Sequence, residues 1–99
     1  MKRSVRILRR AQHDLREIQH YVERDRPEAA GRLVERLLAG IESLERFPRK
    51  GVVPRDARLA GLGYRVLLER DYLVFYKVTP AQVRVYRVLH GGRRHQHMV

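Results

Sequence analysis

The 99-residue sequence contains no cysteine and only half as many acidic as basic residues. Without cysteine, neither a disulfide framework nor a thiolate zinc site can form. No apolar run approaches the roughly 20 residues that a membrane-spanning helix requires. The apolar stretch near the N-terminus is interrupted by arginines and is too short for the core of a signal peptide. We therefore expect a cytoplasmic protein that does not span a membrane.

The motifs of the common catalytic classes are also missing. We find no Ser-His-Asp order, phosphate-binding loop, dinucleotide-binding fingerprint or pair of carboxylates at catalytic spacing. His13 and His20 lie seven residues apart on a predicted helix, too far for one metal ion, and no cysteine or acidic ligand accompanies them. His95 and His97 form an isolated pair in the C-terminal tail. We therefore predict no metal and no cofactor, and we interpret His13 and His20 as surface residues.

Basic residues dominate the charge of the chain. The sequence has 22 lysines and arginines against 11 acidic residues, a formal net charge of +11, and nearly all of the basic residues are arginines. Arginine suits bidentate contact with phosphate or carboxylate, so the composition favours a polyanionic partner. Nucleic acid, an acidic protein segment and an anionic membrane surface each satisfy this charge, and arginine that merely keeps the surface soluble is the simpler alternative. The length fits one domain, residues 1–99, with a single modest core.

Two stretches have the apolar spacing of amphipathic helices. The first stripe comprises Ala11, Leu15, Ile18 and Val22, and the second comprises Ala30, Val34, Leu37, Ile41 and Leu44. Pro27 suits the first turn of a helix, so residues 25–27 predict a tight turn between two antiparallel helices. Gly31 and Gly40 interrupt the second helix, and close packing against a sheet would explain them.

Residues 5–8 predict a short first strand, and three β-rich apolar runs follow in the last third of the chain, at residues 64–69, 72–78 and 83–90. Short polar links separate these runs, which predicts an antiparallel meander of consecutive hairpins. The run at 72–78 is apolar on both faces and is therefore expected at the centre. The alternation in the last run changes phase, which predicts either a bulge near Tyr86 or a face that turns polar toward its end.

The order of the expected elements is β-α-α-β-β-β. This order predicts an α+β fold in which a helical hairpin packs on one face of a small, mainly antiparallel sheet. We expect the other face of the sheet to be open to a partner. Residues 47–63 are expected to form a basic loop.

The candidate binding residues lie on or beside this sheet. They are Arg65, Arg87, His90, Arg93 and Arg94. Such a cluster could hold phosphates or stabilise the charge that develops during RNA cleavage. The turn after His90 could gather backbone amides and guanidinium groups around an anion. The alternative is that His90 is only a polar strand terminus.

Several short motifs recur along the chain in a defined order. They are Ala11-x-x-Asp14-Leu15-x-x-Ile18-x-x-Tyr21, Pro27-x-x-Ala30, Leu44-x-x-x-Pro48-x-x-Gly51, Gly63-Tyr64-Arg65, Tyr72-Leu73-Val74-Phe75-Tyr76 and Arg87-Val88-Leu89-His90-Gly91. Together, in this order and spacing, they resemble the RelE/ParE superfamily of toxins from bacterial type II toxin-antitoxin systems. The resemblance runs almost end to end, and it implies the same β-α-α-β-β-β fold.

Two activities occur in the superfamily, and the chain is more similar to the ParE-like branch. RelE-like members cut mRNA in the ribosomal A site with a set of basic residues and often a C-terminal tyrosine, whereas ParE-like members poison DNA gyrase and lack that set. The nuclease branch commonly has an arginine where this chain has Leu73, and often a basic residue where it has Leu67. An apolar leucine cannot bind phosphate or stabilise an oxyanion. The C-terminal tail contains no tyrosine, and the arginines after His90 resemble the ParE ending.

The resemblance therefore implies a toxin with a role in plasmid stabilization that inhibits DNA gyrase without catalysing a reaction. A cognate acidic antitoxin would neutralise it, and operator DNA would be contacted only through that antitoxin. Under this interpretation no residue is catalytic, and the five candidate residues bind the target or the antitoxin. One alternative is a ribosome-dependent mRNA endonuclease that uses Arg65, Arg87 and His90, with the ribosome and mRNA as partners. A further alternative is a non-toxic antitoxin-binding module.

Overall fold

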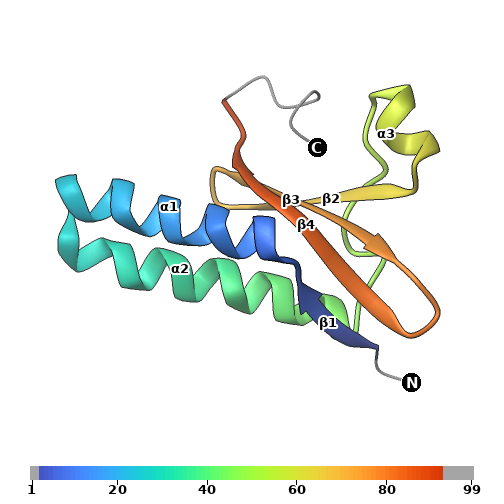
Figure 1. Ribbon diagram of the computed structural model, residues 1–99, viewed down its shortest axis with the longest axis horizontal. Helices are drawn as coiled ribbons and strands as arrows, with labels where there is room; N and C mark the ends of the chain where they lie inside the picture. Colours follow the sequence, from blue (N-terminus) through green and yellow to red (C-terminus); the bar gives the residue numbers. More distant parts are fainter. Residues whose placement is uncertain (1–2, 93–99) are drawn as a thin grey trace.

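The computed structural model describes residues 3–92, which form an α+β fold of helices packed on a four-stranded sheet (Figure 1). The elements are β1 (Ser4–Ile7), α1 (Arg9–Asp25), α2 (Pro27–Glu42), the 3-10 turn η1 (Ser43–Glu45), α3 (Ala57–Gly61), β2 (Tyr64–Glu69), β3 (Tyr72–Val78) and β4 (Gln82–His90). The predicted β-α-α-β-β-β order is confirmed, with one short helix added between α2 and β2.

The strand order in the sheet is β1-β4-β3-β2. Strand β1 runs parallel to β4, and the other two pairs are antiparallel. The predicted position of β3 between β2 and β4 is therefore confirmed. Phe75 pairs with Arg87 but Tyr76 pairs with Val85, so Tyr86 is the extra residue of the predicted bulge. Because the bulge changes the phase of the strand, Val85 and Val88 both reach the core beneath the helices.

The helical hairpin of α1 and α2 covers one face of the sheet (Figure 1). Leu37 and Ile41 of α2 are buried against Val74 and Val85 of the sheet, as the apolar spacing predicts. Pro27 opens α2, and Arg26 is the single residue between the two helices. No helix in residues 3–92 combines the length and the apolar character that crossing a membrane requires.

The opposite face of the sheet carries a second, smaller apolar cluster. Leu59 of α3 is buried there with Tyr64, Phe75 and Leu89. Asp56 caps the N-terminus of α3, and its side chain accepts a hydrogen bond from the Leu59 amide at 3.0 Å. The expectation of a loop throughout residues 47–63 is therefore wrong for Ala57–Gly61, which form α3. The expectation of an open second face is wrong where Leu59 covers the sheet. A five-residue helix with one buried apolar side chain has no periodic pattern to detect.

A tyrosine hydroxyl holds the segment that follows η1. The Tyr76 hydroxyl donates to the Pro48 carbonyl at 2.7 Å and accepts from the Gly51 amide at 2.9 Å. Val52 then pairs with Val66 through two backbone hydrogen bonds, at 2.9 and 2.8 Å, on the outer edge of β2. The segment thereby protects part of a sheet edge that would otherwise present unpaired backbone groups.

The two glycines of α2 have different surroundings. A Cβ atom at Gly40 would meet the side chain of Glu69 at 2.6 Å, whereas nothing lies within 4 Å of a Cβ atom at Gly31. At Gly40, α2 therefore packs closely against a side chain of β2, as expected, whereas Gly31 has no such neighbour.

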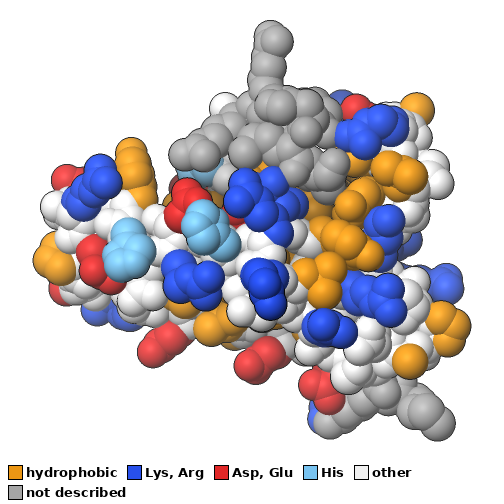
Figure 2. All heavy atoms as spheres, in the orientation of Figure 1, with side chains coloured by type: hydrophobic (Ala, Val, Ile, Leu, Met, Phe, Trp, Pro, Cys, Tyr) orange, Lys and Arg blue, Asp and Glu red, His pale blue; other side chains and the backbone are white. Residues whose placement is uncertain are grey.

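Charged side chains are unevenly distributed over the face drawn in Figure 2. Acidic and basic side chains alternate over the helical hairpin. Over the strands, basic side chains border a strip of hydrophobic surface. On this face, the excess of positive charge is therefore most concentrated beside the sheet.

Candidate functional site

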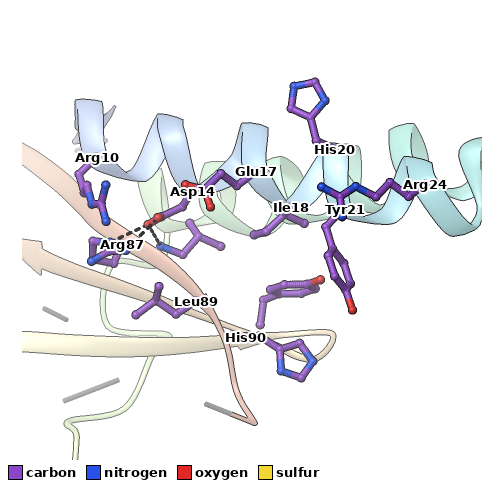
Figure 3. A pocket seen from close by; sticks show the side chains of 12 residues that line it. Arg10, Asp14, Glu17, Ile18, His20, Tyr21, Arg24, Arg87, Leu89 and His90 are labelled. Atoms are coloured by element: carbon purple, nitrogen blue, oxygen red, sulfur yellow. Dashed lines mark hydrogen bonds and ion pairs between the residues drawn. The ribbon is translucent and has the colours of Figure 1, made fainter. Parts of the chain in front are cut away.

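A hollow of about 490 Å³ lies between α1 and the ends of β3 and β4 (Figure 3). Its helical wall carries Arg10, His20 and Arg24, and its strand wall carries Arg87 and His90. Two of the predicted site residues are thus brought together here. The lining also includes two carboxylates and three apolar side chains, those of Asp14, Glu17, Ile18, Val88 and Leu89.

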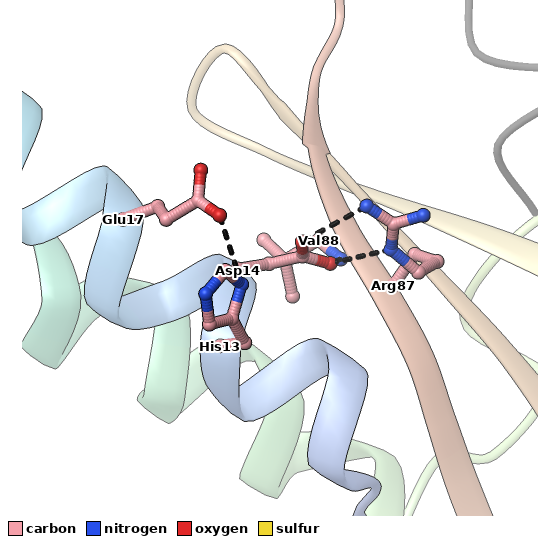
Figure 4. A network of polar contacts seen from close by, with 5 residues as sticks. All are labelled: His13, Asp14, Glu17, Arg87 and Val88. Atoms are coloured by element: carbon pink, nitrogen blue, oxygen red, sulfur yellow. Dashed lines mark hydrogen bonds and ion pairs between the residues drawn. The ribbon is translucent and has the colours of Figure 1, made fainter.

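Asp14 and Arg87 form an ion pair at the base of the hollow (Figure 4). Arg87 Nε donates to Asp14 Oδ2 at 2.7 Å, and Arg87 Nη2 donates to Asp14 Oδ1 at 3.0 Å. Both side chains are almost fully buried, with relative exposures of 8% and 7%. The hydrogen bonds from Arg87 to Asp14 raise the pKa of Arg87, burial opposes this, and the nearby charges of Asp14 and Glu17 add to it. Arg87 is therefore held as a buried cation.

The same carboxylate completes the edge of the sheet. Strand β1 ends at Ile7, and the last backbone bond on this side of β4 runs from the Leu8 amide to the Val85 carbonyl at 3.0 Å. Beyond that point Asp14 Oδ2 accepts from the Val88 amide at 2.9 Å. A side chain of α1 thus takes the place of the strand that has ended, which leaves the buried Val88 amide satisfied.

His90 lies at the exposed end of β4. Its ring meets Tyr72 edge to face, with 5.3 Å between centroids, and its Nδ1 accepts from the Gly92 amide at 3.1 Å. The Gly91 amide donates to the Asp71 carbonyl at 2.8 Å. Both amides of the turn are therefore used within the chain, and the predicted gathering of amides around an anion is wrong for Gly91 and Gly92. Arg93 and Arg94 lie outside the described residues.

Arg65 is placed away from the hollow. Its Nε donates to the Gly51 carbonyl and its Nη2 to the Arg49 carbonyl, both at 3.2 Å. Arg65 pairs with Tyr76 in the sheet, so the two side chains hold the same segment from neighbouring strands. The structure therefore brings Arg87 and His90 together but separates Arg65 from them.

Leu73, which stands where the nuclease branch commonly has arginine, packs with the apolar cluster on the second face. His13 is exposed and lies 2.8 Å from Glu17, one turn further along α1. Within residues 3–92 no three histidines and carboxylates gather in a way that could hold a metal ion.

Asp14 is the important residue to which sequence analysis gave no role. It follows Ala11 by three residues and precedes Ile18 by four, so it lies on the apolar stripe of α1. A carboxylate on a buried stripe requires a buried partner. The position of Asp14 on the apolar stripe therefore indicates a buried polar contact, but it does not identify Arg87 as the partner.

Comparison with known proteins gives consistent results. The model of a family described as ParE toxin of type II toxin-antitoxin system, parDE, matches residues 5–95. Y4kP of Sinorhizobium fredii, a protein named as a toxin, is 30% identical over 93 residues, which cover 94% of this chain and 93% of that protein.

Two solved structures have a similar fold. One is from a chromosomal ParDE toxin-antitoxin system of P. aeruginosa, with a TM-score of 0.74, 21% identity, and coverage of 90% of this chain and 96% of that chain. The other is from the toxin-antitoxin complex RelBE2 of Mycobacterium tuberculosis, with a TM-score of 0.61, 23% identity, and coverage of 91% and 99%.

Proposed function

The chain belongs to the ParE toxin family of type II toxin-antitoxin systems, and we propose that it inhibits DNA gyrase and is neutralised by a cognate acidic antitoxin. The inhibition is by binding, without catalysis of a reaction. We assign five residues to binding of the target or the antitoxin: Arg65, Arg87, His90, Arg93 and Arg94. For Arg65 and Arg87 this contribution is indirect, because both side chains hold neighbouring backbone or side-chain groups in place.

One observation supports inhibition rather than RNA cleavage. A nuclease needs cationic groups that reach the scissile phosphate. Arg87 is buried against Asp14, Arg65 is bonded to two backbone carbonyls, and Leu73 is apolar. Only His90 of the three residues considered for cleavage is exposed at a strand end. A single imidazole does not replace the group of cations that this chemistry uses.

The antitoxin is supported by charge and by the solved relatives. A chain with a net charge of +11 attracts acidic segments. Both solved relatives come from toxin-antitoxin systems. A carboxylate-rich segment that orders as it wraps the toxin would supply both negative charge and apolar anchors.

Two assays run on the same preparation test the proposal. Purified protein is added to gyrase with relaxed plasmid DNA, and separately to ribosomes programmed with mRNA. We expect loss of supercoiling in the first assay and intact mRNA in the second. A variant that ends after Gly92 keeps the Gly91 amide bonded to Asp71 but lacks Arg93 and Arg94, so it should fold and lose inhibition.

The control for the second assay is Arg65→Ala. Cleavage of mRNA in the A site by the wild type, and its loss in Arg65→Ala, would replace gyrase inhibition by the nuclease alternative. Absence of both activities, with antitoxin binding retained, would instead identify a non-toxic binding module.

A further inference from the structure

Three cations stand in one row across the sheet, on the face away from the helical hairpin. Arg6 of β1 pairs in register with Arg84 of β4, and Arg84 pairs with Lys77 of β3. The row ends at Tyr64 of β2, which pairs with Lys77. Residues in register on neighbouring strands have their side chains on the same face.

The burial of the alternate residues fixes the direction of this row. Val5 and Ile7 pack toward the core under the helices, so Arg6 between them points to the other face. Val83 and Val85 are buried in the same core, so Arg84 between them does likewise. Neighbouring strands are about 4.8 Å apart, which places the three cationic residues within roughly 10 Å across the sheet.

No carboxylate in the described part of the chain compensates this row. Within residues 3–92 none of the three cations forms an ion pair. Arg84 Nε donates to the amide oxygen of Gln82 at 2.9 Å, which leaves its charge in place. Like charges on directly opposed residues destabilise a sheet. The arrangement thus costs stability in the absence of an anion.

The lysine of the row is held at the surface by two aromatic rings. Its Nζ lies 4.5 Å from the centroid of Tyr64 and 5.1 Å from that of Tyr86. The two rings meet edge to face, with centroids 5.3 Å apart. A cation held over aromatic faces keeps its charge and loses conformational freedom before any ligand arrives.

From this geometry we propose that the cationic row of Arg6, Lys77 and Arg84 binds the phosphate backbone of duplex DNA. The inference rests on the proposed function, because it is the DNA bound by gyrase that the row would contact. Such contacts are independent of base sequence and therefore differ from operator recognition through an antitoxin.

The surroundings favour a duplex over a single strand or an acidic peptide. Tyr64 is buried and its ring carries Lys77, so it offers no platform on which an unpaired base could stack. Arg84 and Lys77 lie on β4 and β3, the two inner strands of the sheet, whose edges are already paired on both sides. A peptide lying over these two residues could therefore not add as a further strand. A line of phosphates requires only point charges at the surface, which this row supplies.

The test is a titration of a short labelled DNA duplex by fluorescence anisotropy at several salt concentrations. The row variant is Arg6→Gln, Lys77→Gln and Arg84→Gln together. The matched control is Arg16→Gln, Arg32→Gln and Arg36→Gln, which removes three exposed helical charges and leaves the same net charge. Each lost phosphate contact lowers the slope of log K against log salt by about 0.9. We expect the row variant to lose roughly 2.7 of this slope, and the control to keep the wild-type slope.

Two results with the DNA duplex would overturn the inference: no binding by wild type at low salt, or equal losses of slope in both triple variants. Two results with other polyanions would also overturn it: row-dependent binding of duplex RNA but not of duplex DNA, or row-dependent binding of polyglutamate but not of duplex DNA.

A supercoiling assay on the same samples separates this inference from the proposed function. Inhibition of gyrase without duplex binding removes the inference and leaves the function. Duplex binding through the row without inhibition removes the function and leaves the DNA contact.

Discussion

Asp14 has the most interactions of any single side chain described above. It is the partner of a buried arginine and the acceptor for the Val88 amide, so it joins α1 to the part of β4 that β1 does not reach. A buried ion pair adds little stability compared with an apolar pair of similar volume. Removing one partner is costly, because the other charge is then left buried and uncompensated.

Asp14→Ala should therefore destabilise the fold by about 3–5 kcal/mol. Glu23→Ala, on the exposed side of the same helix, should stay within about 0.5 kcal/mol of wild type. Urea titrations followed by circular dichroism measure both. The double variant Asp14→Leu with Arg87→Met should recover part of the loss, since neither charge remains but the Val88 amide loses its acceptor. A cost for Asp14→Ala no larger than that for Glu23→Ala would contradict this account of the pair.

Tyr64 makes the stability of the fold depend on pH in the alkaline range. Burial raises the pKa of Tyr64, the nearby Tyr86 adds to this, and Arg58 opposes it. Lys77 also faces the ring. Because the folded state disfavours the phenolate, the stability contributed here is complete below the ordinary tyrosine pKa of about 10 and is lost as pH rises through the higher folded value.

We therefore expect Tyr64→Phe to flatten the alkaline part of the stability curve. Denaturant midpoints of wild type and variant, measured from neutral pH to above pH 10, give the comparison. The two curves should run parallel near neutral pH and separate only at the alkaline end, where wild type falls more steeply. Curves that stay parallel throughout would show that Tyr64 does not titrate differently in the folded state.

At the scale of elements, the periodic segments could be predicted from sequence and the aperiodic ones could not. The two helices repeat an apolar spacing over at least two turns, and the three meander strands repeat theirs over several alternations. The sequence therefore predicts which of their residues are buried. Helix α3 has only Leu59 to bury. Its single detectable signal is Asp56, a common helix-capping residue that also occurs in many turns.

The candidate site was less predictable than the fold, for a reason visible in β4. The bulge at Tyr86 decides which face each later side chain takes, and with it the contact of Arg87 with Asp14. The phase change in β4 could be predicted from the sequence. The partner of Arg87, which is 73 residues away, could not. Arg65 also looked like a surface cation, because its bonds are to carbonyls of a loop without a periodic pattern.

The loop after η1 and the middle of α2 give opposite predictions for the same substitution. A Cβ atom at Gly51 would lie 2.6 Å from the Tyr76 hydroxyl and 2.7 Å from the Val66 carbonyl, both held in place by hydrogen bonds. Gly51→Ala should therefore destabilise by about 1–3 kcal/mol. Gly31→Ala meets nothing within 4 Å and should stabilise by up to about 1 kcal/mol, since alanine favours a helix interior. Thermal or urea midpoints that move in the same direction for both variants would contradict this assignment.

At the scale of the whole molecule, the charge of +11 on 99 residues acts beyond any one contact. Such a charge speeds the approach of acidic partners and resists compaction of the chain itself. Two kinds of polyanion are proposed here as partners of one small protein, an acidic antitoxin and duplex DNA. The two partners differ in the contacts that they add to the attraction of charge. A protein segment adds apolar anchors, whereas a duplex contacts the row only through its phosphates.

This difference predicts how each partner responds to salt. Binding of the cognate antitoxin, measured by isothermal titration calorimetry, should weaken as salt rises but persist at physiological ionic strength, since screening leaves its apolar contacts intact. The variant with Arg6, Lys77 and Arg84 replaced by Gln should keep this residual affinity while it loses the duplex. An antitoxin whose binding vanishes with salt, as that of a duplex does, would mean that charge alone joins the pair. A row variant that loses both partners equally would mean that they share one surface, and the antitoxin would then neutralise the toxin by covering its DNA contact.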